Sequence, residues 1–189
     1  LESLRQVLPP GALLAGADIP ERHHQDWSGA GPVVPLAVAR PGSTEEIAAV
    51  LRLCNAHGVP VVPHGGLTGL AGAAQPLARG IVLSLSRLNR IERIDAATCT
   101  VTVQAGATLQ ALQDALAEQR LQFGVDLAPR GTCQIGGLLA CNAGGLGVIQ
   151  YGTMRAQVLG LECVLPNGNV LPLRTLPKNS TGYDLAQPI

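Results

Sequence analysis

The fold of this chain is decided by the stretch Val59-Pro60-Val61-Val62-Pro63-His64-Gly65-Gly66-Leu67-Thr68-Gly69-Leu70-Ala71-Gly72. Its first four residues are mostly apolar, which predicts a buried strand over residues 59–62. Residues 63–72, which we call the first glycine-rich loop, contain glycines that permit positive φ and a close approach to a ligand. Successive N–H groups in such a turn converge on an anion. We therefore expect a pyrophosphate site, with the Thr68 hydroxyl as a further donor, or else a glycine-rich surface turn.

A helix and another strand precede this stretch. Ser43 and Glu46 have the spacing of a capping box, and apolar residues recur at helical spacing from Ile47 to Cys54. An apolar stretch over residues 32–38 predicts a strand before that helix. Strand, helix and strand make a βαβ unit. Such a unit delivers the first glycine-rich loop at the carboxyl end of a strand, where open α/β sheets place their ligands.

Regular structure is also predicted after the loop. Short apolar or alternating runs predict strands at residues 81–85, 91–94, 98–104, 157–165 and 169–173. In the third of these strands, Cys99, Val101 and Val103 are expected on the inner face. Thr108 is the expected cap of a second helix, with a stripe of leucines facing inward. Pro166-Asn167-Gly168 is a hairpin signal that joins the last two strands.

A second glycine-rich loop covers residues 126–147. Nearly all of its residues are small or apolar, and backbone with so few large side chains can pack against a flat or extended ligand. Cys133 and Cys141 in this loop are expected to be packed small residues and not redox groups. Two such loops, each beside predicted regular structure, favour a binding site over ordinary turns.

Composition bounds the class of protein. The chain has 189 residues, of which 47% are hydrophobic and 14% charged, so it is globular with a core of its own. Its formal net charge of +0 argues against a nucleic-acid surface. The 5 cysteines are widely spaced without a Cys-x-x-Cys pair, which predicts neither a disulfide framework nor a zinc site. A reducing compartment is the simpler inference from these cysteines, so we expect a cytoplasmic protein, or one peripheral to the inner face of a membrane. No apolar run approaches the roughly 20 residues of a membrane helix.

Several common signatures are missing from the sequence. The only lysine, Lys178, precedes Asn179, so no Walker loop is present, and neither glycine cluster has the Gly-x-Gly-x-x-Gly spacing. No Gly-x-Ser-x-Gly elbow or His-Glu-x-x-His motif occurs. The group His23, His24 and Asp26 admits a metal site, but an exposed loop anchored by Trp27 is the favoured interpretation. The residues alone therefore predict an α+β domain with two loops suited to a pyrophosphate and a large, mostly apolar ligand.

Five motifs in order give the chain a specific resemblance. They are Pro63-His64-Gly65-Gly66-Leu67-Thr68-Gly69-Leu70, Cys133-Gln134-Ile135-Gly136-Gly137, Asn142-Ala143-Gly144-Gly145, Tyr151-Gly152 and Lys178-Asn179-Ser180-Thr181-Gly182-Tyr183-Asp184-Leu185. Together they resemble the PCMH-type FAD-binding domain of the vanillyl-alcohol-oxidase superfamily, most nearly its D-2-hydroxy-acid dehydrogenases. This branch includes D-2-hydroxyglutarate dehydrogenase, D-lactate dehydrogenase and the glycolate oxidase flavoprotein subunit.

The resemblance implies a two-lobed α+β fold with FAD between the lobes. Residues 32–88 would form a small βαβ lobe that binds the pyrophosphate, and residues 89–189 a larger lobe with a mixed or antiparallel sheet and helices. The whole chain would then be a truncated FAD-binding domain. In such proteins the substrate-binding cap and the catalytic and metal residues lie beyond the equivalent of Ile189, so no catalytic or metal residue is assigned.

The implied activity is oxidation of a small D-2-hydroxy acid to the 2-oxo acid, with hydride transfer to FAD and an electron acceptor that the sequence does not identify. One alternative is a flavin-binding or degenerate module, a subunit or a fragment, without its own catalysis. Another is a different branch of the superfamily, such as an aldonolactone or cytokinin oxidase.

The resemblance also implies a set of cofactor-binding residues. At the pyrophosphate these are His64, Gly65, Gly66, Leu67, Thr68, Gly69 and Leu70. Beside the ribityl chain and isoalloxazine they are Gly131, Thr132, Cys133, Gly136, Gly137, Asn142, Ala143 and Gly144, with Tyr151 and Gly152 close by. Leu67 stands where many relatives have Asn or a flavin-attaching His, so the FAD is expected to be non-covalent. Leu138 replaces a frequent Asn and Cys141 a frequent Thr, and each is expected to remove a polar group near the cofactor.

Overall fold

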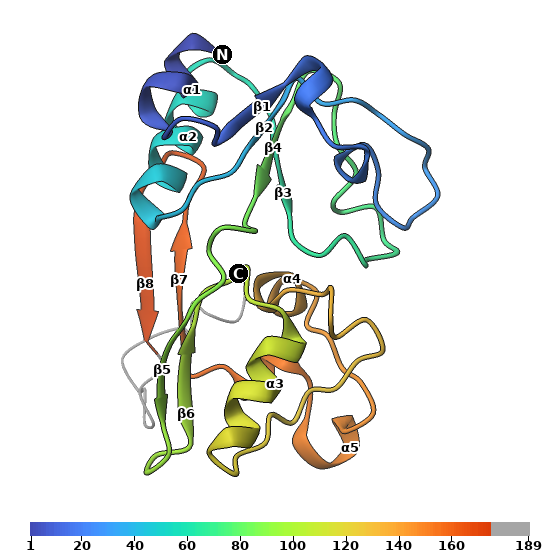
Figure 1. Ribbon diagram of the computed structural model, residues 1–189, viewed down its shortest axis with the longest axis vertical. Coiled ribbons are helices and arrows are strands. Elements are labelled where there is room, and N and C mark those ends of the chain that lie inside the picture. The colour runs from blue at the N-terminus through green and yellow to red at the C-terminus, as the bar shows by residue number, and fades with distance from the viewer. Residues whose placement is uncertain (175–189) are drawn as a thin grey trace.

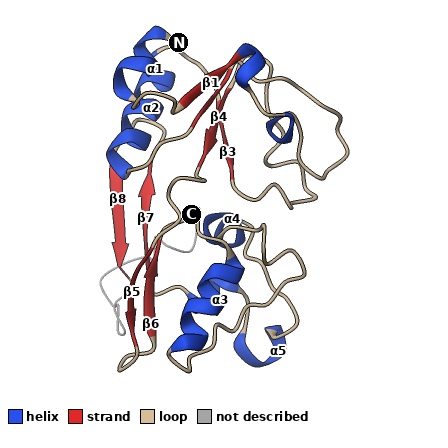
Figure 2. Cartoon of the chain, in the orientation of Figure 1, coloured by secondary structure: helices blue, strands red, loops and turns tan. Residues whose placement is uncertain are grey.

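The computed structural model describes residues 1–174. It has the expected α+β class and two lobes, the upper and lower halves of Figure 1. Figure 2 shows how helices and strands are distributed between them. The motif at residues 178–185 lies outside the described residues.

The first lobe is built on a four-stranded sheet with the order β1-β2-β4-β3. Its strands are β1 (Leu13–Ala15), β2 (Ala37–Ala39), β3 (Val61–His64) and β4 (Ile81–Ser84). β1 pairs antiparallel with β2, while β4 lies parallel to both β2 and β3. Helix α2 (Thr44–Ala56) joins β2 to β3, which confirms the predicted βαβ unit. The first glycine-rich loop leaves the carboxyl end of β3, as expected.

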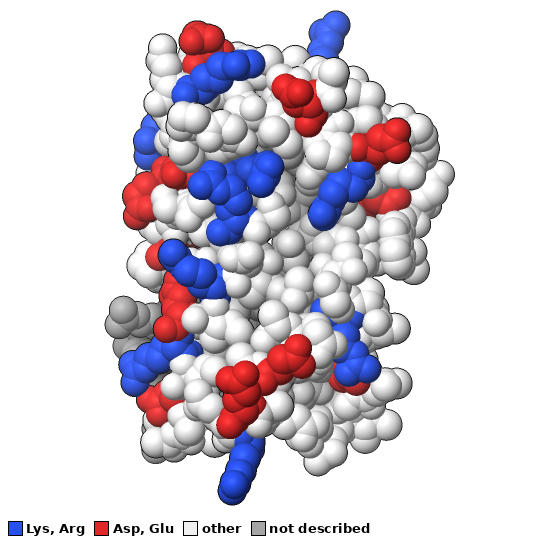
Figure 3. Space-filling model, in the orientation of Figure 1, with Lys and Arg blue, Asp and Glu red and all other residues white. Residues whose placement is uncertain are grey.

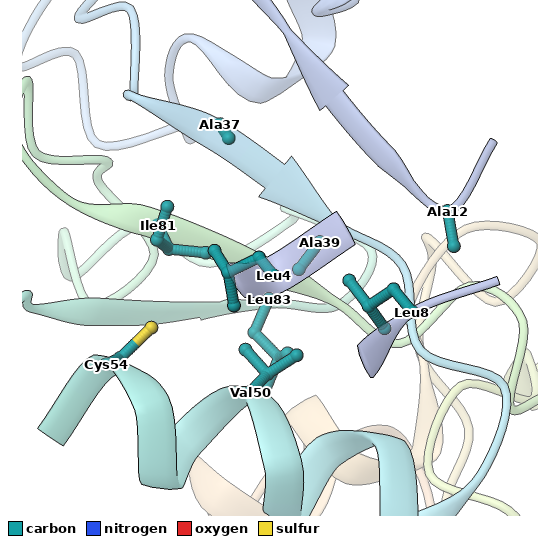
Figure 4. Close-up of a cluster of buried hydrophobic side chains, with 9 residues drawn as sticks. All are labelled: Leu4, Leu8, Ala12, Ala37, Ala39, Val50, Cys54, Ile81 and Leu83. Carbon is teal, nitrogen blue, oxygen red and sulfur yellow. The ribbon is translucent and has the colours of Figure 1, made fainter. Parts of the chain in front are cut away.

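Helix α2 starts where its capping residues predict. The Ser43 Oγ accepts a hydrogen bond from the Glu46 N–H at 3.2 Å, and the Glu46 carboxylate accepts one from the Gly42 N–H at 2.7 Å. The helix packs on the sheet together with α1 (Glu2–Val7). Figure 4 shows the buried cluster that results, formed by Leu4, Leu8, Ala12, Ala37, Ala39, Val50, Cys54, Ile81 and Leu83.

The N-terminal segment completes the first lobe. Besides α1 and β1, it contains the 3-10 turns η1 (Gly16–Asp18) and η2 (Glu21–His23). Ile19 from this segment packs with Val38 and Val82 in a small second cluster. The packing of the first lobe thus begins well before residue 32, where the expected lobe started. The three residues of β1 are too few to produce a readable alternation.

The second lobe contains a hairpin and three short helices. Strands β5 (Ile91–Asp95) and β6 (Thr100–Val103) pair antiparallel, followed by α3 (Leu109–Glu118), α4 (Ile135–Ala140), α5 (Val148–Tyr151) and the 3-10 turn η3 (Met154–Gln157). The Thr108 Oγ1 caps α3 by accepting from the Ala111 N–H at 3.2 Å, as predicted. Cys99 is exposed in the β5–β6 turn with φ 51, so its predicted place on the inner face is wrong. A left-handed turn residue cannot continue the strand alternation.

A last hairpin joins the two lobes. Strands β7 (Gly160–Val164) and β8 (Val170–Arg174) pair antiparallel across the predicted turn, in which Gly168 has φ 80. The first of them starts later than predicted because residues 154–157 form η3. The Thr44 hydroxyl of α2 donates to the Glu162 carboxylate of β7 at 2.7 Å, which ties the hairpin to the first lobe. Within the described residues, the sheets of the second half are two separate ladders of two strands each.

Candidate functional site

The two glycine-rich loops meet between the lobes. A Cβ on Gly66 would lie only 2.1 Å from the carbonyl oxygen of Thr132 and 2.8 Å from the Cys133 Cα. A Cβ on Gly65 would lie 3.5 Å from the Oε1 of Gln134. Since real Cβ atoms do not approach backbone so closely, Gly66 is required for this contact. We call the region around residues 65–66 and 132–134 the loop junction.

The first glycine-rich loop keeps its main-chain donors free. Among the residues that the structure describes, no N–H group of residues 65–72 donates to a protein acceptor. Residues 65–68 are half-buried, while Gly69 and Leu70 are exposed. Backbone N–H groups need a partner, which here must be water or a ligand. A run of such donors at the end of β3, which is only partly buried, fits an anion.

The backbone of this loop differs from expectation in one respect. Of its glycines, only Gly72 has a positive φ, of 78°, and the other left-handed residue is Leu67, with φ 61. The left-handed conformation costs an ordinary residue about 1–2 kcal/mol. Gly66 therefore serves the close contact at the loop junction, whereas the conformational strain falls on Leu67.

The side chain of His64 is turned into the first lobe. Its Nδ1 lies 3.0 Å from the Nδ1 of His23, and the two rings stack with centroids 5.3 Å apart. Burial lowers the pKa of His64 to about 4. Burial also lowers the pKa of His23 to about 4, with His64 and nearby arginines as further causes. Both rings are therefore neutral at pH 7, and His64 can offer a ligand only its main chain.

The interpretation of residues 23–27 as an exposed loop anchored by tryptophan is wrong. His23 and Asp26 are buried, while Trp27 is 64% exposed. His23 is held inside because it pairs with His64, which lies far away in the sequence. In the described part of the chain, no three His, Cys, Asp or Glu side chains converge as metal ligands.

The second glycine-rich loop satisfies much of its backbone internally. The N–H groups of Thr132 and Cys133 both donate to the Pro129 carbonyl at 2.8 Å, and the Gly136 N–H donates to the Ala105 carbonyl at 2.8 Å. Its glycines mostly allow the protein to pack on itself. A Cβ on Gly145, which has φ 126, would lie 2.0 Å from the Asp126 carbonyl oxygen.

Gly131 and Gly137 are exceptions within this loop. A Cβ on either residue would meet no protein atom within 4 Å, and neither has a left-handed φ. Gly137 lies inside α4, where glycine costs roughly 0.8–1.0 kcal/mol relative to alanine. Neither a close protein contact nor a left-handed φ requires glycine at these two positions. The open space beside them is therefore suited to a ligand that approaches the backbone.

Gln134 is a candidate that the expected residues did not include. Its side chain is 8% exposed, and the buried Oε1 has no partner among the described residues. An unpaired buried acceptor costs about 1–3 kcal/mol, so a donor from a ligand would be favourable here. The only signal in the sequence was its place inside the quoted motif Cys133-Gln134-Ile135.

The other expected residues of the second lobe have structural contacts. The Asn142 Oδ1 accepts from the Arg155 N–H at 3.0 Å, and the Ala143 carbonyl accepts from the Met154 N–H at 2.8 Å. Gly144 follows them, with the Val148 side chain 3.5 Å from the position of a Cβ. These contacts hold residues 142–144 against the start of η3.

Tyr151 and Gly152 lie at α5, at the lower end of the second lobe in Figure 1. Tyr151 lines a groove beside α3 together with Gln110 and Phe123. Gly152 has φ 77, and a Cβ on it would lie 2.8 Å from the Ala156 Cβ. The structure therefore does not bring these two residues to the loop junction.

Two expectations about substitutions need correction. Leu138 is 6% exposed in the buried hydrophobic cluster of the second lobe, with Leu109 and Leu112, so it packs there and does not remove a polar group from a ligand surface. Cys141 is exposed and not packed, whereas Cys133 is buried as expected. A short helix such as α4 gives too few residues to separate its inner from its outer face by pattern.

The surface provides no strongly basic region on the face shown in Figure 3, where acidic and basic side chains are interspersed over both lobes. An anion at the loop junction would therefore be held by main-chain N–H groups and not by a cluster of lysines and arginines.

Comparison with known proteins points to a flavin. A family model described as "FAD binding domain" matches residues 35–174. D-2-hydroxyglutarate dehydrogenase from Xanthomonas citri pv. viticola is 47% identical over 183 residues, which cover 96% of this chain and 39% of that protein. Mitochondrial D-2-hydroxyglutarate dehydrogenase from Danio rerio is 39% identical over 186 residues, which cover 98% of this chain and 35% of that protein. The chain thus spans well under half the length of these relatives.

Solved structures show the same fold. An alkyldihydroxyacetonephosphate synthase superposes with a TM-score of 0.88 at 23% identity, over 100% of this chain and 36% of that one. The 6-hydroxy-D-nicotine oxidase of Arthrobacter nicotinovorans superposes with a TM-score of 0.77 at 24% identity, over 89% of this chain and 36% of that one. In residues 1–174, no helix has the length and apolarity needed to cross a membrane.

Proposed function

Because the chain belongs to the FAD-binding domain family, we propose that it is the FAD-binding part of a flavin-dependent dehydrogenase that oxidises a D-2-hydroxy acid to the 2-oxo acid. The substrate class is supported by relatives named D-2-hydroxyglutarate dehydrogenase at 47% and 39% identity. The chain covers 39% and 35% of those proteins, so the substrate-binding cap and the catalytic groups are proposed to belong to the rest of the full-length protein.

One observation supports the cofactor site: within the described residues, no N–H group of residues 65–72 donates to a protein acceptor, and Gly66 of the same loop packs against the second loop. A pyrophosphate held there needs main-chain donors and the Thr68 hydroxyl, with no lysine. Residues 32–88 would supply this half of the site and residues 89–189 the other half. The proposed pyrophosphate-binding set is His64, Gly65, Gly66, Leu67, Thr68, Gly69 and Leu70.

The second half of the site would face the ribityl chain and the ring system. The open backbone at Gly131 and Gly137 leaves room for that contact, and the unpaired Gln134 Oε1 offers an acceptor for a hydroxyl or N–H of the cofactor. Thr132, Cys133 and Gly136 keep the loop in place through main-chain contacts. Asn142, Ala143, Gly144, Tyr151 and Gly152 remain proposed contacts at the outer part of this half.

The chemistry that a bound FAD supplies is acceptance of a hydride from the α-carbon of the hydroxy acid. The residues of this chain would orient the cofactor and neutralise the pyrophosphate charge with dipoles. Half-buried donors at the loop junction compete better with water than exposed ones would, because the local dielectric is lower.

The FAD is proposed to be non-covalent. Leu67 has no group that can bond to a flavin, and the neighbouring His64 is buried against His23. Acid precipitation of the reconstituted protein should therefore leave all flavin absorbance in the supernatant. Flavin retained in the washed precipitate would contradict this attachment.

A reducing compartment is proposed as well: the cytoplasm, or the inner face of a membrane as a peripheral protein. The five cysteines are all free thiols in the structure. Some relatives, such as the protein from Danio rerio, carry the description mitochondrial. Fractionation of cells that produce the tagged full-length protein would distinguish these locations.

The activity is tested with full-length protein reconstituted with FAD. The expected result is a flavin spectrum that is bleached under anaerobic conditions by D-2-hydroxyglutarate and not by the L-enantiomer. Failure to take up FAD would contradict the proposal. Binding without bleaching by any D-2-hydroxy acid would instead favour a flavin-binding module without its own catalysis, the alternative supported by the apolar Leu67 in the first loop.

A further inference from the structure

The two ends of the first glycine-rich loop are both attached to the N-terminal segment of residues 23–31. His64, at the start of the loop, contacts His23. Gln75 follows the loop closely and contacts Gly31 and Asp26. The loop therefore stands between two points that are both attached to this segment.

The attachment at the first end is a buried hydrogen bond between imidazoles. His23 is 5% exposed and His64 is 0% exposed, with their Nδ1 atoms 3.0 Å apart. A hydrogen bond between two neutral rings requires one Nδ1–H donor and one bare Nδ1 acceptor, so the two rings must be opposite tautomers. Such a bond fixes both ring planes, and with them the direction in which the chain leaves β3.

The attachment at the second end uses one amide side chain twice. The Gln75 Nε2 donates to the Gly31 carbonyl at 2.7 Å, and its Oε1 accepts from the Asp26 N–H at 3.5 Å. Asp26 is itself held in a turn, since its Oδ1 accepts from the Ser28 N–H at 2.9 Å and from the Ser28 hydroxyl. At Gly72, the Ser28 side chain lies 3.8 Å from the position of a Cβ.

Between these points the loop has little internal support. In the described chain, the main chain of residues 65–72 makes one turn bond, in which the Gly72 carbonyl accepts from the Gln75 N–H at 3.1 Å, and no N–H group of residues 65–72 donates to a protein acceptor. Without attachment at its ends, the loop would have to be ordered when the ligand binds, and the conformational entropy lost in that ordering would weaken binding. Attachment of both ends to the N-terminal segment lowers this cost without using an N–H group of residues 65–72.

We propose that the His23–His64 pair and the Gln75 bridge to Asp26 and Gly31 are positioning devices that pre-organise the first loop for the FAD pyrophosphate. This inference rests on the proposed function. None of the three side chains, those of His23, His64 and Gln75, is required to touch the cofactor. Each acts through the conformation of residues 65–72.

The test compares variants of the full-length protein by FAD titration and by the melting temperature without FAD. Gln75→Ala removes the bridge, and His23→Leu removes the imidazole hydrogen bond while keeping an apolar side chain. Loss of one such bond should raise the Kd for FAD by about two- to tenfold. His23→Asn, which can still donate to or accept from His64, should restore most of the affinity.

A matched control separates positioning from stability. Val50→Ala in α2 removes buried volume on the opposite face of the sheet, so it should lower the melting temperature and leave the Kd unchanged. If Gln75→Ala and His23→Leu only lower the melting temperature as this control does, the inference is overturned and the proposed function stands. If the wild-type protein does not bind FAD, both are overturned. Should His23→Leu fail to fold, Gln75→Ala at its partly exposed position decides the matter.

Discussion

The two glycine-rich loops resemble each other in composition and differ in where their backbone hydrogen bonds go. In the first loop, the N–H groups of residues 65–72 donate to no protein acceptor within the described chain, and the two ends of the loop are attached to the N-terminal segment through His23 and Gln75. In the second, Thr132, Cys133 and Gly136 donate to nearby carbonyls. The first loop therefore leaves its main-chain donors available, as the proposed cofactor site requires, whereas the second loop uses most of its glycines for packing. Asking where each backbone N–H group donates distinguishes a loop available to a ligand from a loop packed on the protein, whereas the number of glycines does not.

At the loop junction, Gly66 of the proposed cofactor-binding loop packs against the second loop. Gly66→Ala should therefore have the largest effect on both stability and FAD affinity. The added Cβ would lie 2.1 Å from the Thr132 carbonyl oxygen and force the loops apart. We expect a loss of about 3 kcal/mol in the free energy of unfolding and more than about a tenfold loss of FAD affinity. Denaturant titration and FAD titration measure these quantities.

Gly69→Ala is the matched control in the same loop. A Cβ there meets no protein atom within 4 Å, and the φ of Gly69 is not left-handed. Its free energy of unfolding should change by less than about 0.5 kcal/mol. A Gly66→Ala protein as stable as this control would disprove the contact between the loops.

Adjacent glycines in α4 should respond in opposite directions. Gly136→Ala places a Cβ 2.8 Å from the Ala105 Cβ and should lower the free energy of unfolding by about 1–3 kcal/mol. Gly137→Ala meets no protein atom and should raise it by about 0.8–1.0 kcal/mol, while weakening FAD binding. If Gly137→Ala stabilises the protein and leaves FAD affinity intact, the space at Gly137 does not face the cofactor.

Acid should destabilise the first lobe through its histidine pair. The pKa values of His23 and His64 are lowered to about 4 from 6.5, mainly by burial. Because the unfolded chain binds these protons more readily, the stability is complete above pH 6.5 and is lost as the pH falls through about 4. The buried hydrophobic cluster of the second lobe contains no histidine among its described residues. Burial raises the pKa of its Cys133 thiol, which therefore stays neutral in acid.

Melting temperatures between pH 6.5 and pH 4 measure this effect. The double variant His23→Asn/His64→Asn lacks both imidazoles. Its melting temperature should fall less between pH 6.5 and pH 4 than that of the wild-type protein. Parallel curves for the two proteins would contradict the buried, neutral state of the pair.

The smallest effect is expected at Leu67, the strained residue of the first loop. Asn tolerates the left-handed conformation better than Leu, so Leu67→Asn should raise the free energy of unfolding by up to about 1 kcal/mol. Leu70→Asn is the control, because Leu70 is 74% exposed with no left-handed φ, and it should change stability by less than about 0.5 kcal/mol. Equal effects of the two substitutions, measured by denaturant unfolding, would refute the strain at Leu67.

Local chemistry made much of the fold predictable from the sequence. The Ser43 and Thr108 caps bond as their spacing indicates, and the Asn167-Gly168 turn forms its hairpin. Each of these features depends on residues a few positions apart, so the pattern contains the information. The likeness of the quoted motifs to an FAD-binding domain likewise agrees with the matching family model.

Long-range contacts could not be predicted in the same way. The burial of His23 depends on His64, 41 residues away, and the need for glycine at position 66 depends on Thr132. The exposure of Cys99 depends on a left-handed turn that a threonine-rich strand pattern concealed. Gln134 could not be singled out because only the tertiary structure shows its Oε1 to be buried and unpaired.

Amide hydrogen exchange of the full-length protein with and without FAD tests most directly whether the first loop holds the cofactor by its main chain. The amides of residues 65–70 should exchange quickly without FAD and be strongly protected once FAD is bound. Thr132, Cys133 and Gly136, which already donate to protein carbonyls, should change much less. Unchanged fast exchange of residues 65–70 in a protein whose spectrum shows bound FAD would contradict the assignment of the first loop as the pyrophosphate site.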